Sequence, residues 1–356
     1  MVHLENKAPP TMKKILLFIA AIIFISGCEK FEENEFFSYT GDVIITDDSD
    51  IDLFRDILEG RYNVINGNVE ISLPYTRDLS FLNDIRKIDG DLYIDSVKKV
   101  NFFIDLDSVG GNITLIGINE ISSFDILGYC NSITFIESEF TELEGFDRLL
   151  NVDAISIINQ VEPISIFEAF QNLKYIDNLR IDSLDVVRFD GFLDLREVTG
   201  QLVIDKPGDN AFPELKRVRN FLRINRNIGE DCFPQLEQVN QVEISNTRYL
   251  DLSNLYFLPY TVLSLNNCDG LVDLVGINQI EDLGELYIND CDKLQTLEGM
   301  SNTWNLSRVG LRNNPSLTDV CAILALDNPI WNFNISNCGI QYNENQILDG
   351  FCSNDI

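Results

Sequence analysis

Residues 263–271 contain the pattern that decides the fold: Leu263-Ser264-Leu265-Asn266-Asn267-Cys268 is followed by Leu271. Two apolar residues flank a polar one, as in a short strand that buries one side and exposes the other. Steps of 20 to 24 residues separate the recurrences of this triplet, which starts at Val69, Leu92, Ile113, Ile133, Ile155, Leu179, Leu202, Leu222, Val242, Leu263, Leu286, Val309 and Phe333. Such a period predicts a repeat solenoid in which stacked coils align the triplets into one long parallel β-sheet.

A second apolar series, spaced by three residues, precedes the triplets, as in Phe167, Phe170, Leu173 and Ile176. Period three predicts short 3₁₀ turns or extended segments on the other face of the solenoid, and not long α-helices. Glycines stand two residues before several triplets, where we expect tight corners that need a permissive backbone: Gly67, Gly90, Gly111 and Gly200.

In the last four coils an Asn or Cys follows each triplet, and an apolar residue comes after it: Cys268, Cys291, Asn314 and Cys338. This arrangement resembles the leucine-rich repeat, and the Gly-(Asn/Asp) coils before it resemble receptor L domains. Residues 41–352 as a whole resemble bacterial surface proteins of the leucine-rich-repeat/receptor-L-domain type. The resemblance implies a right-handed coil in which the Asn or Cys side chain binds the backbone of the turn.

The N-terminus reads as an export signal. Met12-Lys13-Lys14 precedes an apolar run at 15–25, which is too short for a typical membrane span of about 20 residues. Ser26-Gly27-Cys28 then resembles a bacterial lipobox. We therefore expect translation to start at Met12, the signal that ends at residue 27 to be removed, and Cys28 to carry a lipid. An ordinary signal peptide is the alternative. The acidic stretch 29–33 resembles the export tag of Bacteroidetes-type surface lipoproteins. These features predict an outer-membrane lipoprotein, exposed at the cell surface and attached to the membrane by lipid alone.

The rest of the chain divides into four parts. Residues 28–40 are expected to form a tether and 41–60 an N-terminal cap, with a strand at 41–46 and a helix over 50–58 that opens with a capping box at 49–52. Residues 61–317 form the solenoid and 318–356 a C-terminal cap with a helix near 345–349. The acidic run 47–52 is interpreted as helix capping and solvated charge, with a weak calcium site as the alternative.

Charge and composition exclude several functions. The chain has 26 Lys and Arg against 57 Asp and Glu, a formal charge of -31, so it is a poor binder of nucleic acid. The single histidine, His3, lies in the predicted signal; removal of residues 1–27 leaves 23 basic and 56 acidic residues, a charge of -33 and no histidine. Histidine-based triads and zinc sites are therefore not expected. We predict no enzyme activity, cofactor or metal site, and make no prediction of oligomeric state.

The remaining cysteines receive separate predictions. Cys268, Cys291 and Cys338 occupy the ladder position and are expected to be buried thiols, although a disulfide between Cys268 and Cys291 is an alternative. Cys321 and Cys352 are the best disulfide candidates, as a staple on the C-terminal cap in an oxidising compartment.

The outward-facing residues of the sheet are the candidate binding residues. The middle residues of the triplets include Tyr93, Arg180, Arg223 and Tyr287, and the next outward column holds Asp182 and Asp205. The same column holds Ile116, Ile136 and Ile158, a stacked trio that is either an apolar contact patch or a stabiliser of the sheet.

These features favour a non-enzymatic receptor or adhesin that binds an extracellular protein or glycan on its sheet face. A structural envelope scaffold is the first alternative. A polysaccharide-active β-solenoid enzyme that uses only carboxylates, such as Asp182 and Asp205, is the second.

Overall fold

The structure is a computed structural model that describes residues 37–75, 77–182, 186–206, 211–226, 232–248, 261–277, 283–300, 306–326, 330 and 332–354. The chain divides into two units, Met1–Phe37 and Ser38–Ile356, and nearly all of the described residues belong to the second. The predicted signal at 1–27, the lipidation site Cys28 and most of the tether lie outside the described residues.

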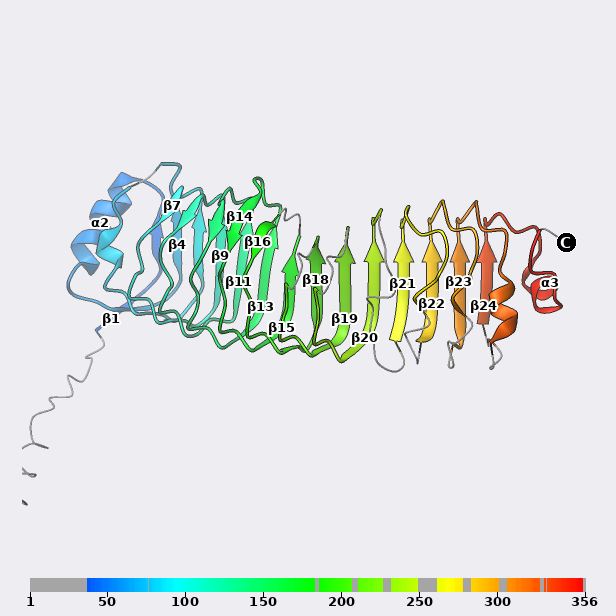
Figure 1. Ribbon diagram of the computed structural model, residues 1–356. Coiled ribbons are helices and arrows are strands. Elements are labelled where there is room, and N and C mark those ends of the chain that lie inside the picture. The colour runs from blue at the N-terminus through cyan, green and yellow to red at the C-terminus, as the bar shows by residue number, and fades with distance from the viewer. Residues whose placement is uncertain are drawn as a thin grey trace, which may run out of the picture. The chain divides into compact units, whose positions relative to one another are not determined.

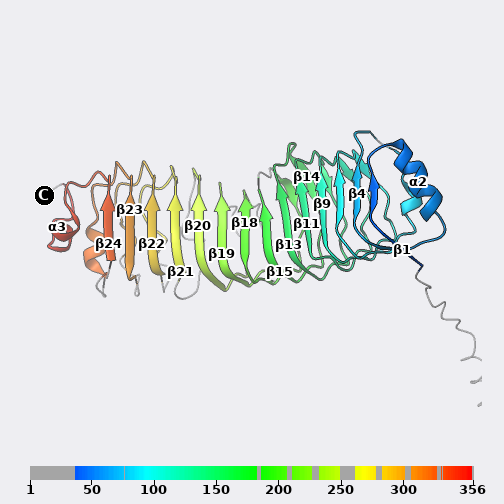
Figure 2. The same ribbon diagram turned by 180° about the vertical axis from the view of Figure 1, so that it is seen from behind.

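The second unit is a parallel β-solenoid. Its main sheet has 15 strands among the described residues, every pair of which is parallel, and both ribbon views show them side by side in one row (Figures 1 and 2). In chain order these are β2 (Val43–Ile45), β4 (Val69–Ser72), β6 (Leu92–Asp95), β9 (Asn112–Ile116), β11 (Ser132–Ile136), β13 (Asn151–Ile158), β15 (Tyr175–Ile181), β17 (Glu197–Val198), β18 (Gln201–Asp205), β19 (Arg217–Asn225), β20 (Gln238–Ser245), β21 (Thr261–Asn266), β22 (Leu283–Asn289), β23 (Arg308–Arg312) and β24 (Asn332–Ser336).

The thirteen predicted triplets all lie in strands of this sheet, so the predicted solenoid with its long parallel sheet is confirmed. The outer two residues of a triplet point into the core, as in Leu222 and Ile224, which are both fully buried. Arg223 between them is exposed. The first strand, β2, falls within the range predicted for the N-terminal cap, and β24 within that of the C-terminal cap, so the sheet extends beyond residues 61–317 at both ends.

In the described coils between Ser38 and Phe189, extended segments with tight turns form the face opposite the main sheet. Three small parallel sheets lie here: β1 (Ser38–Thr40), β3 (Val64–Asn66), β5 (Lys87–Ile88) and β8 (Ser108–Val109); β7 (Lys99–Val100) with β10 (Glu120–Ile121); and β12 (Glu142–Leu143), β14 (Ile164–Phe167) and β16 (Val186–Phe189). Among the described residues, η1 (Ser80–Leu82) and η5 (Cys321–Ala325) are complete 3₁₀ elements, and Ile277 and Met300 are also in 3₁₀ conformation. Both predicted forms therefore occur among the described residues: extended segments in the coils between Ser38 and Phe189, and short 3₁₀ turns at the positions just given.

A recurring Phe-x-x-Leu turn explains the period of three. The amide of Leu173 donates to the carbonyl of Phe170 at 3.1 Å, and the same three-residue hydrogen bond joins Leu149 to Phe146 and Leu195 to Phe192. The phenylalanines stack from coil to coil, with ring centroids 4.9 Å apart for Phe146 and Phe170 and 5.5 Å apart for Phe170 and Phe192. Aromatic stacking and complete burial hold these rings in the core.

The phenylalanines that open these turns adopt an unusual backbone conformation. Their φ angles are positive, between 54° and 70°, in the left-handed region that disfavours bulky side chains: Phe103, Phe124, Phe146, Phe170 and Phe192. Burial of the ring therefore offsets a local backbone cost in coil after coil.

The glycines before the triplets have a different role from the predicted one. Gly67, Gly90 and Gly111 are not among the residues with positive φ, so a permissive backbone is not what they supply. A Cβ added at Gly67 would lie 2.3 Å from the carbonyl oxygen of Gly41, and one at Gly111 would lie 2.2 Å from Asp91 Oδ1. Glycine is needed here because neighbouring coils approach too closely for any side chain.

Helix α2 (Asp48–Leu58) begins two residues before the predicted start and uses a different cap. Asp47, and not the predicted capping box at Ser49, is the N-cap, since its carboxylate accepts from the amides of Ser49 and Asp50. Ile51, Phe54 and Leu58 form the buried face of the helix. The carboxylate of Asp50 accepts from Thr46 and that of Asp48 pairs with Arg77, so the acidic run is engaged in hydrogen bonds and an ion pair.

The C-terminal segment folds back after β24. Helix α3 (Glu344–Leu348) lies one residue before the predicted range, with Asn343 and Gln346 forming a capping box. The carboxylate of Glu344 accepts from the amide of Ile335 at 3.1 Å, which satisfies one donor of strand β24. Cys321 and Cys352, the pair named as disulfide candidates, are joined by a disulfide that ties this segment to η5.

Candidate functional site

The strand register places the predicted binding residues in straight columns on the outer face of the sheet. Arg180 pairs with Val203, which in turn pairs with Arg223, so the two arginines lie two strands apart in one column. Asp205 pairs with Asn225 in the neighbouring column. The structure therefore brings together four of the predicted residues: Arg180, Asp182, Asp205 and Arg223.

These four residues line an open depression of about 470 Å³ on strands β15–β20, which we call the arginine site. Arg180 Nε donates to Asp182 Oδ2 at 2.6 Å, and Arg223 donates to Glu243 Oε2 at 3.2 Å. The Arg223 guanidinium also lies 5.2 Å from the ring centroid of Phe221. The side chains of Arg180 and Arg223 are 58% and 45% exposed, so each guanidinium retains donors that face solvent.

Asp205 is the buried carboxylate that lines the arginine site. It is only 5% exposed and is the one buried carboxylate among the described residues. Asn225 Nδ2 donates to Asp205 Oδ1 at 3.2 Å, and Arg226 Nε lies 3.3 Å from the same oxygen. The buried Asp205 carboxylate, paired with a cation and an amide, fixes the positions of the Asn225 and Arg226 side chains. The Asp182 carboxylate is likewise paired with Arg180.

The surroundings of the arginine site differ in charge from the rest of the chain. Residues 174–226 contain ten Lys or Arg and nine Asp or Glu, whereas the whole chain carries -31. The acidic excess of the chain therefore lies outside residues 174–226, and this part of the sheet carries almost no net charge to repel an acidic partner. A count of charge by segment would have found this feature in the sequence.

The other predicted binding residues lie apart from the arginine site. Tyr93 is on β6, where burial, followed by the charges of Asp95 and Glu70, raises the pKa of its hydroxyl. Tyr287 is on β22; its hydroxyl donates to Glu285 Oε2 at 2.7 Å. A Cβ at Gly310 would lie 2.7 Å from the Tyr287 ring, so the ring covers the neighbouring glycine. The two tyrosines do not share a site.

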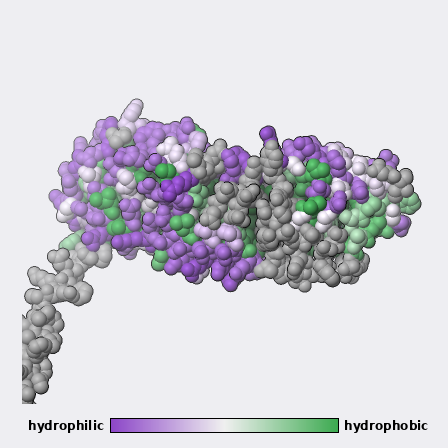
Figure 3. All heavy atoms as spheres, viewed as in Figure 1, coloured by the Kyte–Doolittle hydropathy of each residue, from purple (hydrophilic) through white to green (hydrophobic). Residues whose placement is uncertain are grey.

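The isoleucine trio forms a ladder on three consecutive strands. Ile116 pairs with Ile136, which pairs with Ile158, and all three are half-buried. None belongs to the strongly exposed apolar residues of the described surface, which is largely hydrophilic in the view of Figure 3. Mutual packing of β-branched side chains accounts for this ladder, which favours the sheet-stabilising alternative.

The cysteines and the asparagine of the predicted ladder bind the turn backbone. The amide of Cys291 donates to Asn314 Oδ1 at 2.9 Å, and Asn314 Nδ2 donates to the carbonyl of Ile288 at 2.9 Å. The amide of Cys268 donates to Cys291 Sγ at 3.4 Å, and both residues are free thiols, not a disulfide; Cys338 is a free, half-buried thiol. Burial raises the pKa of the Cys130 thiol to about 12, so that cysteine is not a nucleophile at neutral pH.

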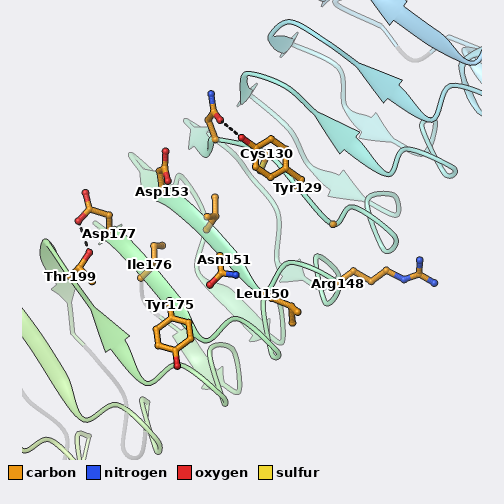
Figure 4. Close-up of a pocket in the computed structure, with 13 residues that line it drawn as sticks. Tyr129, Cys130, Arg148, Leu150, Asn151, Asp153, Tyr175, Ile176, Asp177 and Thr199 are labelled. Carbon is orange, nitrogen blue, oxygen red and sulfur yellow. Dashed lines mark hydrogen bonds between the residues drawn. The ribbon is translucent and has the colours of Figure 1, made fainter.

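A second depression, of about 540 Å³, was not predicted from the sequence. It lies where β13 and β15 extend beyond their triplets toward the start of the coil, and we call it the tyrosine groove (Figure 4). Tyr129 and Tyr175 line it and are 54% and 46% exposed. The strand register pairs Asn151 with Tyr175, and Asp153 and Asp177 also line the groove. The signal that could have found it is the alternation of polar and aromatic residues just before the triplets.

Metal-binding clusters and membrane-spanning helices are two other features by which a site could be recognised. The described residues contain no group of three or more His, Cys, Asp or Glu side chains placed to hold a metal ion. Among them, no helix has the length and apolar character needed to cross a membrane.

Comparison with known proteins does not assign the chain to a family. No protein-family model matches the sequence, and none of the curated proteins matches it significantly.

Proposed function

We propose that this protein is a non-enzymatic binding protein, of the receptor or adhesin kind, that recognises an extracellular protein or glycan at the arginine site. The observation that carries the proposal is the convergence of Arg180, Asp182, Asp205 and Arg223 in one depression on a rigid sheet. Solenoids commonly use such extended faces for binding. Arginine side chains with free donors suit carboxylate or hydroxyl groups of a partner.

The proposal includes the architecture and location of the protein. The Asn/Cys ladder at Cys291 and Asn314 supports a leucine-rich-repeat or receptor-L-domain type of coil, right-handed as in those proteins. Helix α2, which buries Ile51, Phe54 and Leu58, acts as the N-terminal cap. The lipobox-like sequence ending at Cys28 supports an outer-membrane lipoprotein exposed at the cell surface. An envelope scaffold uses the same fold without a specific ligand and is the alternative that the experiments below distinguish.

The double variant Arg180→Ala/Arg223→Ala tests the site. We expect loss of binding to host or matrix ligands by at least about tenfold, because truncation removes two cations from the centre of an interface. A glycan and host-protein array, followed by calorimetry on each hit, provides the measurement.

Arg308→Ala is the matched control for that variant. Arg308 is 55% exposed and pairs with Glu285 at 3.1 Å, much as Arg223 pairs with Glu243, but it lies on β23 away from the site. Equal binding by the wild type and the double variant removes the arginine site from consideration. Absence of any ligand on the array, together with crosslinking that recovers only envelope components, favours the scaffold.

The Cys28→Ala variant tests the location. If Cys28 carries the lipid anchor, the variant should leave the membrane fraction, since one cysteine is the sole proposed attachment point. Metabolic labelling with a palmitate analogue and protease treatment of intact cells measure lipidation and surface exposure. Membrane retention of the variant with undiminished labelling contradicts the proposed anchor.

A further inference from the structure

We infer that the tyrosine groove is a second binding site, distinct from the arginine site, and that it takes a neutral oligosaccharide. Tyr129 and Tyr175 form its two platforms, and polar side chains on the same and adjoining strands supply the hydrogen bonds (Figure 4). The inference does not depend on the proposed function of the arginine site, because the two depressions share no lining residue.

The two tyrosines are placed as platforms for sugar rings. Both rings are about half-exposed, although Tyr is a large side chain that gains from burial. Asn151 pairs with Tyr175, and by the same register Tyr129 lies opposite Asn151 on the preceding coil, so the platforms are two coils, or about 10 Å, apart. The hydroxyl of Tyr129 donates to Asn131 Oδ1 at 3.0 Å, which fixes one platform before any ligand arrives.

The polar groups that line the groove beside the platforms suit sugar hydroxyls. Asp177 is pre-oriented, since Oδ1 accepts from Thr199 Oγ1 at 2.7 Å and Oδ2 from Asn178 Nδ2 at 2.8 Å. Within the described residues, the Asp153 carboxylate and the Asn151 amide have no hydrogen-bond partner, although both are exposed in the groove. Carboxylate and amide oxygens accept hydrogen bonds from hydroxyl groups, while the aromatic faces receive the apolar faces of the rings.

Charge and backbone pairing select the class of ligand. Two carboxylates, Asp153 and Asp177, line the groove against one cation, Arg148, and the chain as a whole carries a charge of -31, so an acidic polysaccharide is disfavoured. The amide of Asp153 donates to the carbonyl of Asn131 and that of Val109 to the carbonyl of Tyr129, so these backbone groups are already paired with neighbouring coils. A peptide could not bind here by adding a strand, since that mode needs free backbone groups. A neutral saccharide needs neither positive charge nor a free edge.

The test is binding of neutral hexasaccharides to the full-length chain. The probes are cello-, xylo-, manno-, laminari- and malto-oligosaccharides, with an oligogalacturonate as the acidic comparison, measured by saturation-transfer NMR and calorimetry. We expect at least one neutral probe to bind with a dissociation constant below about 1 mM, and the acidic probe to bind more weakly. Tyr129→Ala and Tyr175→Ala should each weaken binding by about tenfold or more.

Two controls keep the result interpretable. Tyr175→Phe retains the ring and should stay within about threefold of the wild type, because the platform is intact. Arg180→Ala/Arg223→Ala should leave the neutral probe unaffected, which separates this site from the arginine site. Circular dichroism and melting establish that each variant is folded. Failure of every neutral probe to bind, or binding that survives both Tyr→Ala changes, or a preference for the acidic probe, overturns the inference.

Discussion

Replacement of Phe170 by alanine is expected to destabilise the solenoid by about 3–5 kcal/mol, the cost of removing a fully buried aromatic ring. The ring is completely buried and stacks on Phe146 at 4.9 Å and on Phe192 at 5.5 Å. Each coil rests only on its neighbours, so a void at one position weakens both adjoining interfaces. Urea unfolding followed by circular dichroism measures the shift in midpoint.

The backbone at Phe170 makes the prediction more specific. Its φ is 62°, a conformation that glycine adopts readily and alanine does not. The Phe170→Gly variant should therefore be at least as stable as Phe170→Ala, the reverse of the order in ordinary strand or helix positions. Leu150→Ala is the control, because Leu150 is 49% exposed and should shift stability by less than about 1 kcal/mol. If Phe170→Ala is no worse than this control, the stack does not stabilise the fold.

Much of the architecture could be predicted because one physical signal repeats. Alternation of buried and exposed residues is a local property, and thirteen triplets at a near-constant period leave few alternatives to a stacked parallel sheet. The register then follows, since Arg180, Val203 and Arg223 hold the same position in successive coils. This is why the arginine site could be anticipated by residue number.

The features that escaped prediction depend on contacts between coils. Neither the left-handed backbone of Phe170 nor the close approach at Gly67 has a signature in a single repeat. The sequence alone therefore indicates only a core residue at Phe170 and a permissive backbone at Gly67. Asp47 is the N-cap of α2, and Ser49 is not. Both Asp and Ser are favoured N-cap residues, so the sequence alone does not distinguish two candidates that lie within three residues. The tyrosine groove was missed because Tyr129 and Tyr175 lie outside the triplets and are 46 residues apart in sequence.

The second large effect concerns the disulfide between Cys321 and Cys352. It closes a loop with a sequence separation of 31, for which the chain-entropy relation gives about 3–4 kcal/mol. Backbone bonds reinforce the same attachment: the amide of Val320 donates to the carbonyl of Cys352 at 2.8 Å and that of Asn354 to the carbonyl of Thr318 at 3.1 Å. We expect the double variant Cys321→Ser/Cys352→Ser to lose protection of β24 and α3 while the coils before them persist. Hydrogen exchange resolved by peptide measures this.

Loss of the disulfide should also expose the terminal edge of the main sheet to association with other molecules. β24 is a terminal strand of the main sheet, and Glu344 on α3 accepts from its Ile335 amide. Release of α3 would free that donor and expose Phe333 and Ile335, which are partly buried now, so the variant should self-associate through an unpaired edge. Cys338→Ser is the control, since Cys338 is a free thiol in the same region. A double variant that stays monomeric in light scattering, with β24 exchanging no faster than in the control, would show that the cap is held by packing alone.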